Sequence, residues 1–112
     1  MNRSNRSLMA GVPELMLLRL LSEREMYGYE LARAIRVLSD GALSLGEGVL
    51  YPALHALEER KLLRSRKAQV DGRLRVYYTL SPTGHIRLNK LTREWRRIRT
   101  GLESILGRPD HG

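Results

Sequence analysis

The spacing of apolar residues changes abruptly near residue 63, and this change restricts the fold more than any other feature of the sequence. Residues 63–69 and 74–80 alternate with a two-residue period, which predicts two β-strands. Asp71-Gly72 lies between them and strongly favours a tight hairpin turn. Apolar residues follow a helical period before and after this segment. The chain is therefore expected to place one β-hairpin between helices.

Three helices are predicted before the hairpin. The first opens near Pro13, because proline suits the first turn of a helix, and its leucines surround the helix so fully that part of it should be buried against a second chain. The second runs from Tyr27-Gly28 to Asp40-Gly41. The third starts near Gly48, where Pro52 fits because it falls near the first turn. Its inward residues are Leu50, Ala53, Leu54 and Leu57.

The last helix has the most regular pattern in the chain. Ser81-Pro82 provides a cap and a first-turn proline for it. Its apolar residues are spaced alternately three and four apart, which predicts a seam for a partner helix and hence a homodimer. Packing of this seam on the chain's own core is the alternative. The expected dimerisation residues are Leu15, Leu18, Leu88, Leu91, Trp95, Ile98, Leu102 and Ile105.

Three helices followed by a two-stranded hairpin is the element order of a winged helix-turn-helix. We therefore expect a mainly α fold with a β-hairpin, in which a winged helix is joined to a long C-terminal dimerisation helix. Its expected divisions are a flexible arm over 1–11, the winged helix over 12–80, the dimerisation helix over 81–107 and a disordered tail over 108–112.

The net charge of +8 is confined to the second half of the 112-residue chain, because residues 1–56 hold six basic and six acidic side chains. Residues 60–75 hold seven basic side chains against Asp71 alone, and residues 87–99 hold six against Glu94. Such local fields favour a polyanion partner, with nucleic acid ahead of an anionic membrane, although a solvated basic surface would look the same. The candidate phosphate-binding residues on or beside the hairpin are Arg64, Arg66, Lys67, Arg73 and Arg75.

Several classes of function are not supported by the sequence. The chain lacks cysteine, its three histidines are widely separated, and it has neither a Gly-rich phosphate loop nor a paired nucleophile and base. We therefore expect no enzyme activity, no metal and no cofactor. The longest apolar stretch is too short to span a bilayer, and the apolar face of the last helix is too narrow for a membrane surface. A cytoplasmic protein is expected.

Three segments resemble the PadR family of transcriptional regulators. Tyr27-Gly28-Tyr29-Glu30-Leu31 is similar to its helix 2 motif, residues 48–58 (GVLYPALHALE) to its helix 3 motif, and residues 73–84 (RLRVYYTLSPTG) to its wing strand and the entry into its last helix. The match extends from about Leu15 to Trp95. The short chain resembles the small PadR members, in which a single C-terminal helix mediates dimerisation. Val49 replaces the usual Ser or Thr, and Lys61 replaces the usual Gly at the end of helix 3.

The resemblance and the helical phase together predict DNA-contacting residues outside the hairpin. Tyr51 and His55 lie off the inward stripe of the third helix and should face outward, whereas Tyr29 and Tyr78 are expected in the core. This helix has few arginines to read guanine directly, so recognition of DNA shape is expected to contribute to specificity. The candidates are Tyr27, Gly28, Gly48, Val49, Tyr51, Pro52 and His55.

The expected function is that of a dimeric, sequence-specific regulator of the bacterial type that binds double-stranded DNA at an inverted-repeat operator. The resemblance further implies a repressor released by a planar aromatic effector, with Trp95 at a candidate effector site between protomers. The alternative from another class is an effector-free architectural or protein-docking winged helix. Trp95 has its own alternative, a plain hydrophobic dimer contact.

Overall fold

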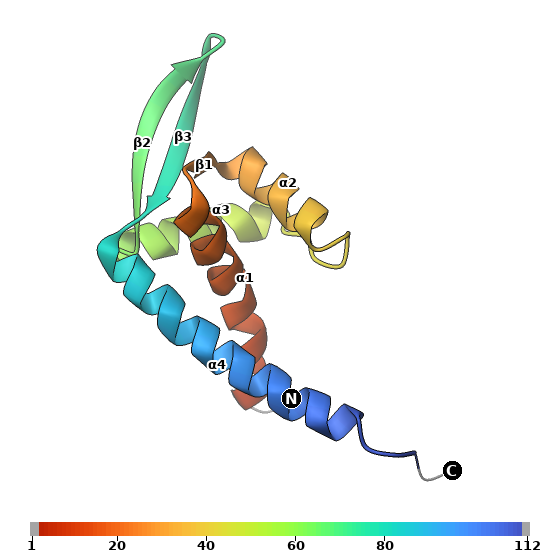
Figure 1. Cartoon of the computed structure of the whole chain (residues 1–112). Coiled ribbons are helices and arrows are strands. Elements are labelled where there is room, and N and C mark those ends of the chain that lie inside the picture. Colours follow the sequence, from red (N-terminus) through yellow and green to blue (C-terminus); the bar gives the residue numbers. More distant parts are fainter. Residues whose placement is uncertain (1–2, 111–112) are drawn as a thin grey trace.

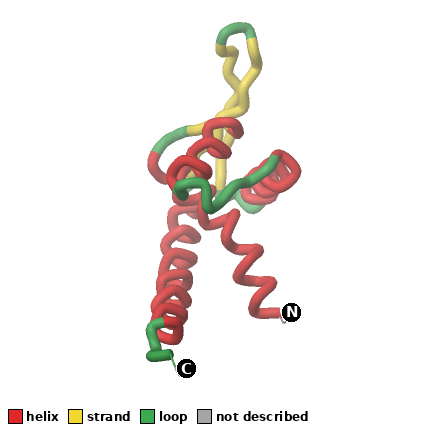
Figure 2. The backbone as a smooth tube through the Cα atoms, turned by 90° about the vertical axis from the view of Figure 1, so that its right-hand side faces the viewer, coloured by secondary structure: helices red, strands yellow, loops and turns green. Residues whose placement is uncertain are grey.

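The computed structural model describes residues 3–110, and the side chains from residue 11 onward. Four helices and three strands follow one another as α1 (Arg3–Glu23), β1 (Met26–Tyr27), α2 (Gly28–Leu38), α3 (Glu47–Glu59), β2 (Leu63–Val70), β3 (Arg73–Leu80) and α4 (Pro82–Leu106). The β2–β3 hairpin, called the wing below, projects from one end, while α4 and the start of α1 project from the other (Figures 1 and 2). The predicted winged helix with a long C-terminal helix is confirmed.

The core is built around the second half of α1, which contacts α2, α3, β3 and α4. Leu17, Leu18, Leu20 and Leu21 are all buried there. The helix is apolar on most sides because elements of its own chain surround it, so these four leucines need no second chain to cover them. Leu18 in particular is fully buried and cannot contact a partner, which corrects its assignment to dimerisation.

The start of α1 also differs from the prediction. The helix begins at Arg3 rather than near Pro13, so residues 3–11 are helical where a flexible arm is expected from the sequence, and residues 1–2 lie outside the described residues. Pro13 is therefore inside the helix. A proline removes one backbone hydrogen bond but its own φ is already helical, so a helix with tertiary support can continue through it.

The sheet is antiparallel with strand order β1-β3-β2. The predicted hairpin is present, and its turn residues Asp71 and Gly72 have φ of 51° and 76°, as the favoured two-residue hairpin turn requires. The short strand β1 adds the pairs Met26–Tyr78 and Tyr27–Tyr77. Sequence reasoning misses β1 because two residues cannot display a period.

The end of α3 is closed by a residue in the left-handed region. Lys61 has φ of 64°, and the N–H groups of Lys61 and Leu62 donate to the carbonyls of Glu58 (2.9 Å) and Leu57 (3.0 Å). This is a Schellman ending, in which the left-handed position is normally glycine. The Lys61 carbonyl then accepts hydrogen bonds from Ser81 Oγ (2.6 Å) and Thr83 Oγ1 (2.8 Å).

The start of α4 matches the prediction closely. Ser81 is its N-cap, accepting a hydrogen bond from the Gly84 N–H at 3.0 Å, and Pro82 is its first residue. The carboxylate of Glu14 on α1 bridges to Arg87 of α4 (3.0 Å) and to Arg60 at the end of α3 (3.3 Å). These contacts join α1 to the end of α3 and to the first part of α4.

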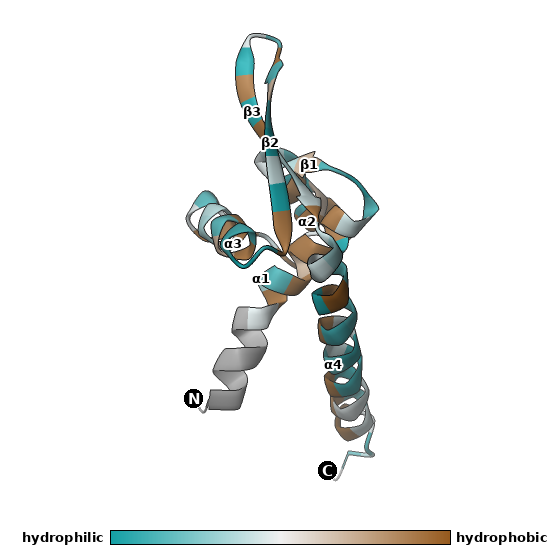
Figure 3. Ribbon diagram, turned by 90° about the vertical axis from the view of Figure 1, so that its left-hand side faces the viewer, coloured by the Kyte–Doolittle hydropathy of each residue, from teal (hydrophilic) through white to brown (hydrophobic). Residues whose placement is uncertain are grey.

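The seam along α4 divides into two parts. Leu88 is buried in the chain's own core, which corrects its assignment to dimerisation, and Leu91 packs against that core as Leu15 of α1 does. Trp95 is half-buried. Beyond it, Ile98, Leu102 and Ile105 are exposed, the last by 67 %. Apolar segments recur along the projecting part of α4 (Figure 3).

Candidate nucleic-acid interface

The outward surface of α3 is formed by residues opposite its buried stripe. Leu50, Leu54 and Leu57 face the core, whereas Gly48, Pro52 and His55 are exposed. Pro52 is the sixth residue of α3, deeper in the helix than the sequence predicts, and its missing N–H leaves the carbonyl of exposed Gly48 without a helical donor. The middle of the outward surface of α3 thus carries the small Gly48 and Pro52 and the imidazole of His55.

Tyr51 lies on one flank of this surface and is held there by α2. A Cβ atom on Gly28 would lie 2.8 Å from the Cε1 and Cζ atoms of the Tyr51 ring, so only glycine allows the ring to rest there. Tyr51 is 38 % exposed and Gly28 is buried. The candidate Gly28 is therefore covered by the Tyr51 ring and supports that ring from below.

Val49 lies on the opposite flank of α3. With Ala53, Ala56 and Pro13 of α1 it lines a shallow groove of about 350 Å³ that also includes the Glu14–Arg60 ion pair. Its isopropyl group is half-exposed. Val49 and Tyr51 thus border the same outward surface from two sides.

The register of the wing sorts its side chains between two faces. Residues paired across the strands share a face, so Arg64, Arg66, Arg73, Arg75 and Tyr77 lie on what we call the outer face. The inner face carries Lys67, Val76 and Tyr78, and packs toward α3, where Ser65 Oγ donates a short hydrogen bond to the Glu58 carboxylate. The four arginines therefore lie on the sheet face turned away from α3.

Two of these arginines are engaged within the chain. Arg66 Nε donates to Oε2 of Glu25 at 2.7 Å and its terminal nitrogen donates to Oε1, while its guanidinium lies 4.9 Å from the centre of the Tyr77 ring. This hydrogen-bonded guanidinium holds the pKa of Glu25 below its usual range. Arg75 stacks on Tyr27 at 4.5 Å, and Tyr27 meets Tyr77 edge to face at 5.4 Å.

The two tyrosines expected in the core behave differently. Tyr78 is buried, and this burial, more than the nearby Glu58 and Tyr51, raises its pKa. Tyr29 is 61 % exposed, so its assignment to the core is wrong. It occupies the first turn of α2, where the phase that buries Leu31 turns it toward solvent.

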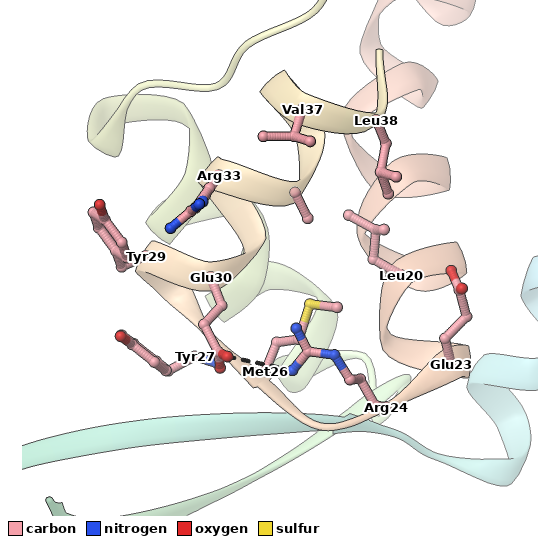
Figure 4. A pocket seen from close by; sticks show the side chains of 11 residues that line it. Leu20, Glu23, Arg24, Met26, Tyr27, Tyr29, Glu30, Arg33, Val37 and Leu38 are labelled. Atoms are coloured by element: carbon pink, nitrogen blue, oxygen red, sulfur yellow. Dashed lines mark hydrogen bonds and ion pairs between the residues drawn. The ribbon is translucent and has the colours of Figure 1, made fainter. Parts of the chain in front are cut away.

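A second surface lies beside α2, away from the outward surface of α3. A groove of about 600 Å³ runs between the end of α1 and α2 (Figure 4). Leu20 and Met26 form its floor, and exposed Tyr29, Val37 and Leu38 lie along its sides. Arg24 and Glu30 pair at 3.3 Å on its rim.

Sequence reasoning misses two carboxylates that organise these surfaces, Glu14 and Glu25. Each is one of several acidic residues in a charge-balanced half of the chain, and nothing local distinguishes it. Their partners come from distant segments, as Arg66 does, 41 residues after Glu25. The hairpin register alone places Arg66 opposite Tyr77, but it does not indicate that Glu25 lies beside them.

Neither a metal centre nor a membrane span is present in residues 3–110. In that part of the chain no three His, Cys, Asp or Glu side chains are grouped to hold a metal ion. No helix there is long and apolar enough to cross a membrane.

Comparisons with known proteins agree with this architecture. The model of the transcriptional regulator PadR-like family matches residues 17–90. Transcriptional regulator Rv3488 of Mycobacterium tuberculosis is 33% identical over 90 residues, which are 80% of this chain and 78% of the relative. A solved PadR family transcription regulator from Clostridium difficile superposes with a TM-score of 0.75 at 31% identity, covering 87% of this chain and 100% of the other.

A second solved structure, a PadR-like transcriptional regulator from Bacillus cereus, gives a TM-score of 0.78 at 26% identity, with 92% of this chain and 99% of the other covered. Members of this family are transcriptional regulators rather than enzymes. The family match spans the winged helix and the first part of α4, the segments that present the outward surface of α3 and the wing. The chain belongs to the PadR-like family of transcriptional regulators.

Proposed function

We propose that this chain is a cytoplasmic, dimeric regulator that binds an inverted-repeat operator in double-stranded DNA, acting as a repressor released by a small molecule. The observation that carries DNA binding is the exposed surface of α3 beside a projecting, strongly basic wing. In a winged helix the third helix enters the major groove and the hairpin lies along the backbone.

The contacts divide between base edges and phosphates. The α3 residues that face the groove are Gly48, Val49, Tyr51, Pro52 and His55. The small Gly48 and Pro52 favour close approach of the helix, and Tyr51 and His55 can reach base edges. On the wing, the exposed residues for phosphate contact are Arg64, Lys67 and Arg73.

Four further candidates already serve contacts inside the chain. Arg66, Arg75 and Tyr27 are engaged on the outer face of the wing, and Gly28 lies beneath Tyr51. We assign these four to shaping the interface rather than to direct contact.

Dimerisation is assigned to the projecting part of α4. Ile98, Leu102 and Ile105 lie at seam spacing and are exposed in the single chain. Exposing this regular apolar seam to water is unfavourable, and a partner helix would bury it. A two-fold axis along this seam would present two copies of α3, and symmetric half-sites follow from such symmetry.

The effector site is assigned to Trp95. Its indole is half-buried at the point where the seam leaves the core, so two copies near a dimer axis would border a slot suited to a planar aromatic cation. Fluorescence of this single tryptophan, titrated with a panel of such cations, should be quenched at micromolar concentration. No quenching by any of them, together with a monomeric Trp95→Ala variant, would leave a plain dimer contact instead.

A protein-docking winged helix remains the second candidate, and the groove beside α2 favours it. Exposed Tyr29, Val37 and Leu38 offer apolar area there that DNA binding through α3 does not use.

Selection of bound duplexes from a random pool tests the first proposal, because a DNA regulator of this symmetry should return an inverted-repeat consensus. With that duplex, Lys67→Ala and Arg73→Ala together remove two phosphate contacts from each protomer and four from the dimer. They should therefore flatten the slope of log K against log salt by about 3.6, since each contact contributes about 0.9. Lys90→Ala on α4 is the matched control and should leave the slope unchanged. Recovery of no consensus would favour the docking module.

A further inference from the structure

A single carboxylate connects the two edges of the sheet. Glu25 immediately precedes β1, and the strand order β1-β3-β2 places the central strand between it and Arg66 on β2. Their ion pair therefore crosses Tyr77 of β3, the direct cross-strand partner of Arg66. No other ion pair found among the described residues joins the two edge strands.

The geometry of this pair is restrictive for both side chains. Two guanidinium nitrogens meet the two carboxylate oxygens, and the plane of the guanidinium covers the Tyr77 ring at 4.9 Å. A two-pronged contact with a stacked cation fixes direction as well as distance, which a single exposed ion pair does not. The Arg66 guanidinium is thus held along its edge by Glu25 and on its face by the Tyr77 ring.

A neighbouring contact connects the same region to the helices. Tyr27 carries the Arg75 guanidinium on its ring and touches Tyr77 edge to face. Tyr27 also precedes α2 directly, and its N–H donates to Glu30 in the first turn of that helix at 3.2 Å. Because Tyr51 of α3 rests on Gly28 of the same turn, the base of the wing and the outward surface of α3 share one support.

We propose that Glu25 is a positioning residue for DNA binding: through Arg66 it clamps the base of the wing at a fixed angle to α3, so that the tip and α3 engage one duplex together. This inference rests on the proposed DNA-binding function. Only two residue pairs join β1 to β3, whereas eight pairs join β2 to β3, so the attachment of the hairpin to the body through β1 is short. The clamp acts at that attachment.

The competing role for Glu25 has the opposite consequence. If Arg66 binds a phosphate, Glu25 only neutralises it in the free protein and opposes DNA binding. Removing Glu25 would then strengthen binding and add one phosphate contact per protomer, two in the dimer, to the salt dependence. A positioning role predicts weaker binding with no change in that dependence.

The experiment compares Glu25→Ala with Glu23→Ala, which removes an equal charge from an exposed position at the end of α1. Binding is measured by fluorescence anisotropy over a range of KCl concentrations, with the selected consensus duplex and a 30-base-pair mixed-sequence duplex. We expect Glu25→Ala to bind the consensus about three- to fivefold more weakly than Glu23→Ala, with an unchanged salt slope. Tighter binding with a slope steeper by about 1.8, or equal binding by the two variants, would overturn the proposal.

A charge swap, Glu25→Arg with Arg66→Glu, provides the rescue. It restores the ion pair but places an acid where a phosphate contact would need a base, so recovered affinity supports positioning and a further loss contradicts it. Amide hydrogen exchange across residues 63–80 measures the clamp without DNA, and Glu25→Ala should speed exchange at the base of the wing about threefold or more. If the wild type binds neither duplex, the DNA-binding function fails, and unchanged exchange would refute the clamp separately.

Discussion

Replacing Lys61 by glycine should stabilise the protein. Lys61 holds φ of 64° to close the Schellman ending of α3. A side chain with a Cβ atom costs about 1–2 kcal/mol in this region, whereas glycine adopts it freely. The side chain of Lys61 is exposed, and its contacts with Ser81 and Thr83 use the backbone carbonyl, so both hydrogen bonds survive the change.

The net gain is smaller than the relief of strain. Glycine also increases the conformational entropy of the unfolded chain, which opposes folding by about 0.4–1 kcal/mol. The expected increase in the free energy of unfolding is therefore about 0.5–1 kcal/mol. For a chain of 112 residues the entropy of unfolding converts this into a rise in Tm of about 2–4 °C.

Differential scanning calorimetry at one fixed protein concentration measures the shift, and Lys61→Ala is the matched control. Alanine removes the same charged side chain but keeps the Cβ atom, so it should give little or none of the gain. An equal rise for alanine would show that the charge of Lys61, rather than its backbone conformation, is unfavourable. A lower Tm for Lys61→Gly would refute the reasoning altogether.

Gly84→Ala should lower the free energy of unfolding by about 1–3 kcal/mol, because its Cβ would collide with a backbone carbonyl and a leucine side chain; Gly101→Ala, with open space around it in the same helix, should instead be neutral or stabilising. Glu14→Gln should cost about 1 kcal/mol by weakening two ion pairs with partly exposed arginines, seen as a lower Tm than that of the equally neutralised Glu23→Gln. The raised pKa of Tyr78 contributes stability that is fully present below the unfolded pKa of about 10 and is lost as pH rises through the folded pKa. Alkaline unfolding monitored by circular dichroism should therefore be less steep in Tyr78→Phe, and identical profiles would contradict this assignment.

The parts of the fold that sequence predicts well carry their signal within a few residues. Asp71-Gly72 predicts the hairpin turn because both positions need positive φ, and Ser81-Pro82 predicts the start of α4 because a cap and a first-turn proline are local devices. Once the hairpin is placed, its period also sorts Val76 and Tyr78 onto the core side.

The parts that sequence misses depend on neighbours from elsewhere in the chain. The leucine-rich α1 indicates burial but not whether its own chain or a partner supplies the cover, and Leu18 shows that its own chain does. The basic cluster on the wing indicates positive charge, but it does not show which arginines are already paired within the chain. Glu25 reaches Arg66 because β1 pairs with β3, and this pairing is not visible in the sequence. Periodicity identifies which face is apolar, whereas assigning the contact requires the tertiary arrangement.

The short strand β1 has a consequence for the order in which the molecule forms. The hairpin turn and the helices close contacts between near neighbours, whereas pairing Met26 with Tyr78 requires a long loop to close first. The entropy cost of closing this loop is offset only when the segments at both of its ends are already structured. We therefore expect β1 to join the sheet in a late folding step. The wing would then exist as an isolated ribbon in the early stages, and the edge of β3 would stay open to other chains until β1 covers it.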